Sequence, residues 1–337
     1  MRNLSIAVVG ATGLVGSTLL TLLQEQGFPA ASLRLLASKN SAGTQIAYDN
    51  TILTVCDLSE FDFNQTNIAF FCVDTDLAAK YVPIATMAGN IVIDKSFHYR
   101  THDDVPLIVP EVNPDAIADY KKMGIIANPN CNVIPVAVGL KPIYDAVGIK
   151  RINICTYQSV SGTGKNAISE LTSQTKQLLD NQPVVSKVYP QQIAFNVLPH
   201  IDDFQENGYT REEMKIVWEM RKIFNDNNLA INPTAVRVPV FCGHAAAVHI
   251  ETDDKITASH ARKLLSAASG IKLIDDHSAY PTPAIHAAGQ DDVFVGRIRE
   301  DISLDRGLNL WIVADNLRKG AALNAIQIAN QLIKHYL

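Results

Sequence analysis

The sequence predicts an α/β protein with two domains, the first doubly wound and the second an α+β domain with a mixed sheet. Three observations lead to this prediction. The chain has 337 residues, which is more than one core of ordinary size requires. Short apolar runs alternate with helical periodicity over residues 1–128, as in doubly wound domains. Beyond residue 131 the expected strands and helices are longer and alternate less regularly, which favours a mixed sheet.

The first domain begins with an apolar strand at residues 6–9. The helix expected after it carries apolar side chains at spacings of three and four: Val15, Leu19, Leu22 and Leu23. A sheet that helices cover on both faces needs strands that are apolar throughout. Such runs predict further strands at residues 33–37, 68–73, 91–94, 107–109 and 125–127.

In the second domain, strands are expected at residues 151–157, 236–241 and 247–251. Thr210 and Glu213 form a capping-box pattern, which opens a helix that runs to about Asn225 and has Glu212 and Lys215 in its first turns. The final segment, 320–336, is also expected to be helical. We expect the first domain to comprise residues 1–128 with 315–337, and the second to comprise residues 129–314.

The composition is that of a globular protein, with 47% hydrophobic and 19% charged residues. A net charge of −5 without basic runs makes nucleic acid an unlikely partner. No apolar stretch is long enough for a membrane helix and no signal peptide is recognisable, so we expect a cytoplasmic protein with no membrane partner. The five cysteines lack CxxC spacing, so neither a disulfide framework nor a metal site is expected.

A glycine-rich loop joins the first expected strand to the first expected helix. Its sequence is Gly10-Ala11-Thr12-Gly13-Leu14-Val15-Gly16. Glycines here allow a tight turn and close approach to a pyrophosphate, which the N–H groups and dipole at the helix N-terminus attract. The loop therefore predicts a Rossmann-like dinucleotide site rather than a purely structural turn.

The loop after the second strand bears on the choice between NADP and NAD. NAD sites usually place a carboxylate there to bind the ribose hydroxyls. Residues 36–43 instead provide Ser38, Lys39 and Ser41, which suit a 2′-phosphate. The sequence thus favours NADP, and the alternative is a polar turn with an exposed lysine.

Cys131 lies between an expected strand and the apolar stretch 133–140, in the sequence Asn128-Pro129-Asn130-Cys131-Asn132. A thiol at the N-terminus of a helix has a lowered pKa, and the thiolate is the nucleophilic form. Taken alone, a cysteine in this position is more often structural.

Several motifs along the chain are specific in combination. These are Gly10-Ala11-Thr12-Gly13, Val109-Pro110-Glu111-Val112-Asn113, Pro129-Asn130-Cys131, Tyr157-Gln158-Ser159-Val160-Ser161-Gly162-Thr163-Gly164, Ala194-Phe195-Asn196, Val236-Arg237-Val238-Pro239-Val240 followed by Gly243-His244, Phe294-Val295-Gly296-Arg297-Ile298-Arg299 and Asp315-Asn316-Leu317. Together they make the chain resemble the bacterial type of aspartate-semialdehyde dehydrogenase along nearly its whole length.

The resemblance implies a cysteine mechanism. Cys131 would attack an acyl phosphate, Gln158 would orient the reacting carbonyl, and His244 would move a proton to and from the hemithioacetal oxygen. We expect this histidine near its ordinary pKa of about 6.5, where it serves as both acid and base. The remaining implied roles are substrate binding by Arg100, Asn130, Glu212, Lys215 and Arg237, and cofactor binding by Gly10, Thr12, Gly13, Leu14, Val15, Ser38, Lys39, Ser41, Ser161, Gly162 and Asn316.

Within these roles, Arg237 and Glu212 would hold the α-carboxylate and the amino group of the substrate, and Arg100 and Lys215 would bind the departing phosphate. Without the resemblance, we would predict that Arg237 is a solvent-exposed charged residue on a strand. The sequence departs from the family pattern where Asn132-Val133 follows the cysteine in place of Ser-Thr, and where Asp74 lies in a loop that is usually serine-rich.

The implied reaction is the NADPH-dependent reduction of L-aspartyl 4-phosphate to L-aspartate 4-semialdehyde and phosphate, in lysine, threonine and methionine biosynthesis. Two alternatives stay open, a reductase of an N-acetylated glutamyl phosphate and a catalytically inactive paralogue. The resemblance also implies a homodimer whose interface lies on the second domain, and a last helix that returns to the first.

Overall fold

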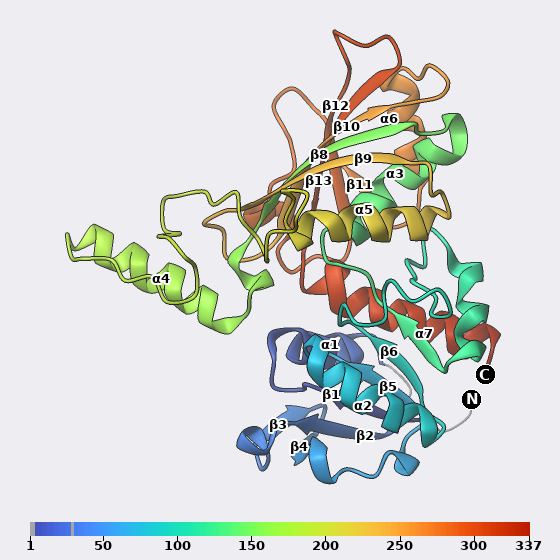
Figure 1. Cartoon of the computed structure of the whole chain (residues 1–337), viewed down its shortest axis with the longest axis vertical. Coiled ribbons are helices and arrows are strands. Elements are labelled where there is room, and N and C mark those ends of the chain that lie inside the picture. The colour runs from blue at the N-terminus through green and yellow to red at the C-terminus, as the bar shows by residue number, and fades with distance from the viewer. Residues whose placement is uncertain (1–3, 28–29) are drawn as a thin grey trace. The chain divides into compact units, whose positions relative to one another are not determined.

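The computed structural model describes residues 4–27 and 30–337 and divides the chain into two compact units (Figure 1). Unit 1 consists of Met1–Asn130 together with Ala321–Leu337, and unit 2 is Cys131–Gly320. The chain therefore crosses between the units twice, once at the cysteine and once near its end.

Unit 1 contains a seven-stranded sheet in the order β3-β4-β2-β1-β5-β6-β7. Neighbouring strands are parallel except for the antiparallel pair β3 and β4. This order, with β1 in the middle, confirms the doubly wound prediction. The strands are β1 Leu4–Val9, β2 Ala30–Ala37, β3 Gln45–Tyr48, β4 Thr51–Asp57, β5 Ile68–Phe71, β6 Ile91–Asp94 and β7 Ile125–Ala127.

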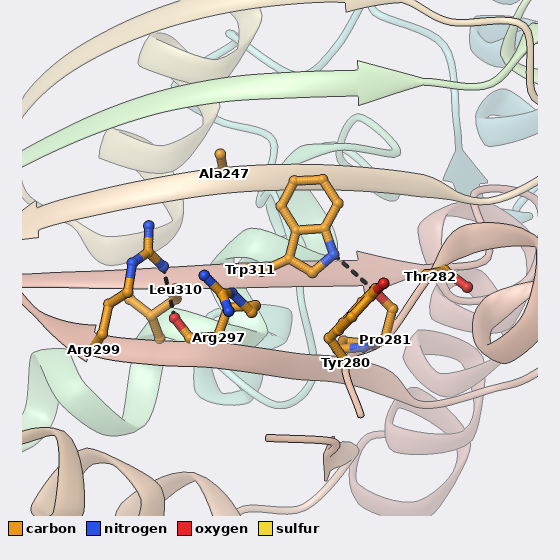
Figure 2. A pocket seen from close by; sticks show the side chains of 8 residues that line it. All are labelled: Ala247, Tyr280, Pro281, Thr282, Arg297, Arg299, Leu310 and Trp311. Carbon is orange, nitrogen blue, oxygen red and sulfur yellow. Dashed lines mark hydrogen bonds between the residues drawn. The ribbon is translucent and has the colours of Figure 1, made fainter. Parts of the chain in front are cut away.

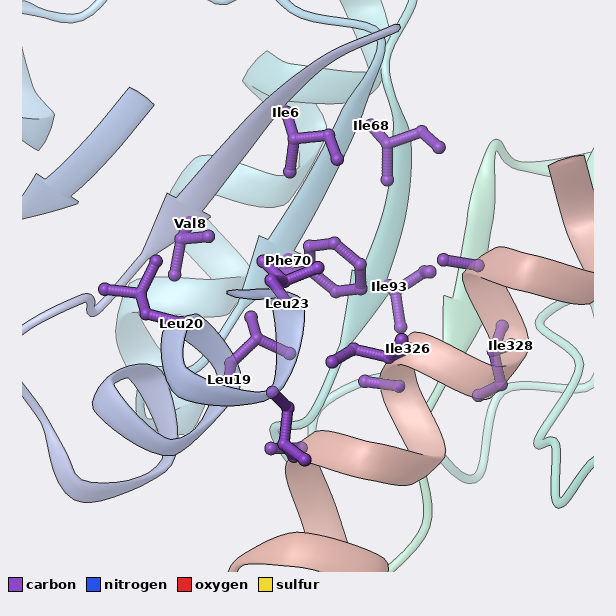
Figure 3. Close-up of a cluster of buried hydrophobic side chains, with 14 of the residues drawn as sticks. Ile6, Val8, Leu19, Leu20, Leu23, Ile68, Phe70, Ile93, Ile326 and Ile328 are labelled. Atoms are coloured by element: carbon purple, nitrogen blue, oxygen red, sulfur yellow. The ribbon is translucent and has the colours of Figure 1, made fainter. Parts of the chain in front are cut away.

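The α-helices in the described part of unit 1 are α1 Leu14–Glu25, α2 Thr75–Met87 and α7 Leu323–His335. Figure 3 shows Ile326 and Ile328 of α7 in one buried cluster with side chains from α1, β1, β5 and β6. The last helix belongs to unit 1. Its apolar face supplies part of a core that residues 4–130 would otherwise leave open.

Unit 2 contains a six-stranded mixed sheet in the order β11-β12-β13-β10-β8-β9. The pairs β8/β9 and β11/β12 are parallel, and β10 is antiparallel to both of its neighbours. The mixed sheet is therefore confirmed. The strands are β8 Arg151–Gln158, β9 Ala230–Arg237, β10 His244–Glu251, β11 Ile271–Leu273, β12 Val293–Glu300 and β13 Gly307–Ala314.

The helices of unit 2 are α3 Val133–Val147, α4 Lys165–Leu179, α5 Arg211–Phe224 and α6 Ala258–Ala267. Helix α3 contacts both α5 and α6, and the three helices cover one face of the sheet (Figure 1). The capping box that opens α5 is present, because the side chains of Thr210 and Glu213 each accept the other's backbone N–H. Asn225 ends α5 in the left-handed conformation, as a C-terminal cap does.

Two expected strands differ from the structure. Residues 107–109 form only a single bridge, from Leu107 to Ala127, because prolines on both sides of this segment cannot donate to a ladder. The strand expected at 236–241 lies earlier and ends at Arg237. There Pro239 interrupts the ladder, and the Val240 N–H bonds back to the Val238 carbonyl.

Short helical turns connect these elements. They are η1 Lys39–Ser41, η2 Leu58–Glu60, η3 Phe63–Gln65, η4 Pro114–Lys122, η5 Val160–Gly162, η6 Pro283–Ala287 and η7 Arg318–Ala322.

We expect Ile326→Ala to lower the free energy of unfolding by about 2–5 kcal/mol, because it leaves a cavity in a fully buried site. Urea unfolding followed by circular dichroism measures this loss. Asn330→Ala, on the exposed face of the same helix, is the matched control and should cost less than about 0.5 kcal/mol. Equal effects of the two substitutions would show that α7 does not contribute to the core.

Candidate functional site

Four strands of the unit 2 sheet begin or end on the same side of the sheet: β8, β9 and β13 end there, and β10 begins there. Gln158 at the end of β8 pairs with Arg237 at the end of β9, since these strands are parallel. Strand β10 runs the other way and begins there with His244, which pairs with Ala314 at the end of β13. Asn316 follows two residues later. Strand direction therefore gathers side chains that are far apart in the sequence.

Cys131 opens unit 2 and lies two residues before α3, at the junction that the sequence predicted. No side chain caps this helix, so its N-terminal dipole is available to act on the thiol. Gly320 packs against the cysteine, and a Cβ there would lie 3.0 Å from the Cys131 carbonyl oxygen. Burial raises the pKa of both Cys72 and Cys242 to about 12, so neither is a thiolate near neutrality.

The His244 ring is buried, with 2% exposure, and only one of its nitrogens is satisfied. Nδ1 lies 3.0 Å from the backbone nitrogen of Ser159 and 3.0 Å from the Ser159 hydroxyl. Nε2 is buried without a hydrogen-bond partner among the described residues. An unpartnered polar atom in the interior is costly, and functional sites are where such atoms occur.

The expectation that His244 titrates near 6.5 is wrong for this structure. Burial, together with the nearby Arg237 guanidinium, lowers its pKa to about 3. Both causes disfavour the imidazolium, because a cation loses hydration on burial and is repelled by a neighbouring cation. The resting centre therefore holds a neutral imidazole.

Arg237 is buried rather than solvated, with 5% exposure. Its Nη1 donates to the Ser159 carbonyl oxygen at 2.8 Å, and its Nε has no partner among the described residues. Gly162 lies against both buried groups, since a Cβ there would be 3.1 Å from Arg237 Nη1 and 3.3 Å from His244 Nε2. The glycine keeps open a space beside a guanidinium and an imidazole, which suits a polar, anionic ligand.

Glu212 is the centre of a buried hydrogen-bond cluster. Its Oε1 accepts from the Gln158 amide at 3.2 Å and from the Asn132 amide at 3.1 Å, and its Oε2 accepts from Lys215 at 3.2 Å. Gln158 Nε2 also donates to Thr156 Oγ1 at 3.3 Å. Because a carboxylate only accepts, the Gln158 amide nitrogen faces Glu212, and its carbonyl oxygen is left for other contacts.

The two expected phosphate ligands lie in different units. Lys215 of unit 2 forms ion pairs with Glu212 and, at 2.7 Å, with Asp202. Arg100 of unit 1 is buried and donates from Nη2 to the Lys95 carbonyl oxygen at 2.5 Å. Asn130, the other expected substrate ligand of unit 1, is also buried.

The glycine-rich loop of unit 1 has the geometry that a dinucleotide requires. Gly10 has a φ of +85°, and a Cβ there would lie 2.5 Å from the Cys72 carbonyl oxygen. A Cβ on Gly16 would lie 2.1 Å from the Gly10 carbonyl oxygen. Helix α1 begins at Leu14 after Gly13, and no side chain caps it. Its first N–H groups, including those of Leu14 and Val15, therefore suit a pyrophosphate.

The second expected cofactor segment places Ser38, Lys39 and Ser41 in and before the turn η1, where they are largely exposed. Pairing of β2 with β4 also brings Asp57 beside Ala37. Hydrogen bonds from Ser59, and to a smaller extent the charge of Lys39, lower the Asp57 pKa. Sequence spacing could not reveal this carboxylate, because it arrives from a neighbouring strand. Asp74 caps α2 by accepting from the Leu77 N–H.

Sequence reasoning missed the residues that support the site. Tyr189 places its ring 6.0 Å from the Arg237 guanidinium carbon and bonds through its hydroxyl to Thr163. The segment that carries Tyr189 is fixed by the Glu170 carboxylate, which accepts the backbone N–H groups of Lys187, Val188 and Tyr189. A glutamate in a helix gives no sequence signal for such a role.

A cavity of about 360 Å³ lies elsewhere in unit 2, on the sheet face opposite α3 (Figure 2). Arg297 and Arg299 lie on one side of Trp311, and on the other side the Trp311 ring nitrogen donates to the Pro281 carbonyl oxygen at 2.9 Å. None of the expected site residues lines this cavity. Across residues 4–27 and 30–337 we find no group of three or more metal-ligating side chains, and no helix there is long and apolar enough to cross a membrane.

Comparison with family models defines the class of protein. Residues 5–120 match the model described as "Semialdehyde dehydrogenase, NAD binding domain". Residues 140–319 match the one described as "Semialdehyde dehydrogenase, dimerisation domain". The two matches lie in unit 1 and unit 2 respectively, and the class is that of the semialdehyde dehydrogenases.

Individual relatives narrow the class. The chain is 56% identical over 338 residues to aspartate-semialdehyde dehydrogenase of Legionella pneumophila, covering 100% of this chain and 97% of the relative. It is 52% identical to the enzyme of Shewanella sp. (strain DB6705), covering 99% of each. The structure of aspartate semialdehyde dehydrogenase II from Vibrio cholerae, complexed with ASA, has a TM-score of 0.99 at 52% identity and covers 100% of both chains. The chain belongs to the aspartate-semialdehyde dehydrogenase family.

The lowered pKa of His244 makes stability depend on pH. Between its unfolded pKa of 6.5 and its folded pKa of about 3, the unfolded chain binds a proton that the folded chain does not. The free energy of unfolding therefore falls as the pH falls, by about 2 kcal/mol at pH 5 for this group. His244→Gln, which cannot titrate, should lose correspondingly less between pH 7 and 5.

Urea unfolding followed by tryptophan fluorescence measures this, because both tryptophans, Trp218 and Trp311, lie in unit 2. His260→Gln, at an exposed position, is the control and should keep the wild-type slope. An identical pH dependence in wild type and His244→Gln would contradict the buried neutral state.

Proposed function

We propose that the chain catalyses the NADPH-dependent reduction of L-aspartyl 4-phosphate to L-aspartate 4-semialdehyde and phosphate, a step in lysine, threonine and methionine biosynthesis. Full-length identity of 52% and 56% to aspartate-semialdehyde dehydrogenases supports this. The observation that carries it is the pair of buried polar groups, Arg237 and His244, that face Gly162 in the unit that begins with Cys131.

The first step forms a thioester. The Cys131 sulfur bonds to the acyl carbon, and the carbon–oxygen bond to phosphate breaks, so that phosphate leaves with the electron pair. The dipole of α3 favours the attacking thiolate. Arg100 and Lys215 are the proposed phosphate ligands, since both are cations and phosphate carries the charge that leaves.

When bound, NADPH supplies the hydride that turns the thioester into a hemithioacetal. We propose that the loop of Gly10, Thr12, Gly13, Leu14 and Val15 holds its pyrophosphate. Ser38, Lys39 and Ser41 would hold the 2′-phosphate, and Ser161, Gly162 and Asn316 would lie at the nicotinamide. His244 Nε2 would contact the hemithioacetal oxygen. Collapse of this adduct breaks the carbon–sulfur bond, releases the aldehyde and restores the thiolate.

We base the choice of substrate on two buried charged side chains of unit 2, Arg237 and Glu212. Arg237 suits the α-carboxylate, because a guanidinium can form two parallel hydrogen bonds with it. Glu212 is the proposed partner of the free amino group, since a buried carboxylate favours a cation nearby. A reductase of an N-acetylated glutamyl phosphate has no use for such a carboxylate, because its substrate carries a neutral amide at that position.

We expect the protein to oxidise aspartate semialdehyde in the presence of phosphate and NADP, and Cys131→Ser to abolish this turnover. A serine has no sulfur to form the thioester, and its hydroxyl is a weak nucleophile near neutrality. The substitution leaves the nucleotide site unchanged, so NADPH should still bind. Spectrophotometric assay of NADPH formation and fluorescence titration of NADPH measure the two properties.

Three results would overturn parts of this proposal. Turnover of only the N-acetylated aldehyde would exclude the aspartyl substrate. A clear preference for NAD over NADP in Michaelis constant would exclude the proposed 2′-phosphate site near Lys39. An undiminished rate in Cys131→Ser would exclude the thioester.

We further propose that the chain is a homodimer whose interface is the sheet face of unit 2 opposite α3, α5 and α6. This face bears the Tyr157 and Trp311 rings, with centroids 5.4 Å apart, and Ala247, which pairs with Trp311 in the ladder. These side chains are only half-buried in one chain. A two-fold axis would bring the same face of a second copy against them. The model matched by residues 140–319 is described as a dimerisation domain.

Ala247→Glu should convert the dimer to a monomer, because it places a charge in the middle of this face. Size-exclusion chromatography with light scattering measures the mass. Ala267→Glu, at the exposed end of α6 on the opposite side, is the control and should remain dimeric. A dimeric Ala247→Glu protein would place the interface elsewhere.

A further inference from the structure

The two nitrogens of the His244 ring are not equivalent. The Ser159 backbone N–H points at Nδ1 from 3.0 Å. A peptide N–H can only donate, so Nδ1 must present its lone pair. In a neutral imidazole the proton then sits on Nε2, the nitrogen that lies beside Gly162. The resting ring therefore offers a hydrogen-bond donor, and not a base, at Nε2.

Two side chains hold the loop that carries the Ser159 peptide: Arg237, which donates to the Ser159 carbonyl oxygen at 2.8 Å, and Asn316. Asn316 is buried, with 2% exposure, and its Oδ1 accepts from the Ser161 hydroxyl at 3.0 Å. It also lies 3.2 Å from the Ser159 hydroxyl oxygen, whose single proton is directed to Nδ1 when that nitrogen presents its lone pair. The Asn316 Oδ1 accepts the Gly243 backbone N–H at 2.9 Å as well. Asn316 thus ties the loop after β8 to the residue that precedes His244 on β10, which are the two segments that set the ring's position.

We propose that Asn316 is a positioning residue that fixes His244 as the Nε2–H donor to the reacting carbonyl oxygen. This inference rests on the proposed function, which requires a donor where negative charge develops on that oxygen. The Gln158 amide cannot take this part, because both of its N–H groups are directed to Glu212 and Thr156. Of Gln158 and His244, only His244 has an N–H group, at Nε2, that is available to donate to the carbonyl oxygen.

The chemistry that follows is one of hydrogen bonding rather than proton removal from the thiol. A neutral Nε2–H stabilises the oxyanion that forms when sulfur or hydride adds to the carbonyl carbon. Arg237 on β9 donates to the Ser159 carbonyl oxygen, and the Cys242 thiol before β10 contacts both Asp315 and Asn316. Asp315 accepts the backbone N–H groups of Leu317, Arg318 and Gly289, so its charge is already compensated.

The experiment measures two properties separately, the tautomer of His244 in the resting protein and the rate of turnover. Nitrogen-15 NMR of the histidine-labelled full chain, with His244 assigned by its loss in His244→Gln, should give the Nε2–H signature in wild type. Asn316→Ala removes the shared acceptor, so it should give mixed tautomers and a kcat lower by about 10²–10³, with a KM within about threefold.

Asn316→Asp keeps an oxygen acceptor at the same place, so it should restore the Nε2–H tautomer and most of the lost kcat. Asn227→Ala, at an exposed position of unit 2, is the matched control and should leave both readouts unchanged.

An Nδ1–H signature in wild type would overturn the inference, and so would an unchanged tautomer in Asn316→Ala despite a lower kcat. If Asn316→Ala does not fold, the wild-type and Asn316→Asp spectra decide, because both must show Nε2–H. Failure of the proposed function is distinct, since it would appear as no turnover of aspartate semialdehyde by a wild-type protein whose tautomer is as stated.

Discussion

The direction of β10 is the constraint on which the candidate site depends. Because β10 runs against β8 and β13, its first residue, His244, lies at the same edge as the last residues of those strands. If this eight-residue strand ran the other way, His244 would lie at the far edge of the sheet, about 25 Å away at roughly 3.3 Å per residue. The hydrogen bond from the Ser159 peptide to His244 could not then form.

Local signals in the sequence predicted the elements that are built from neighbouring residues. The glycine-rich loop from Gly10 lies between β1 and α1, and Cys131 lies just before α3, as the sequence indicated. The capping box at Thr210 opens α5 at the expected residue. Such features are predictable because each requires only a turn, a cap or an apolar period within a few residues.

Features that arise from distant pairing could not be predicted in this way. From the sequence alone, Arg237 is predicted to be a solvent-exposed charged residue on a strand. It is buried because α5, Tyr189 and the loop after β8 pack around the end of β9. The ordinary pKa expected for His244 failed for the same reason, since desolvation and a neighbouring guanidinium are properties of the folded chain. Asp57 reaches the neighbourhood of Lys39 only through the pairing of β2 with β4.

The anchoring of the Tyr189 segment bears on how readily this scaffold can evolve. The buried Glu170 carboxylate accepts three successive backbone N–H groups. The last of these belongs to Tyr189, whose ring lies next to the Arg237 guanidinium. A mutation that changes the surroundings of Arg237 must be compatible with the fixed backbone of the Tyr189 segment. Otherwise it leaves the buried Arg237 charge without its contacts, which is strongly destabilising. Few substitutions near Arg237 should therefore allow the protein to bind ligands of a different shape. Variation tolerated by the fold should accumulate on the exposed turns instead.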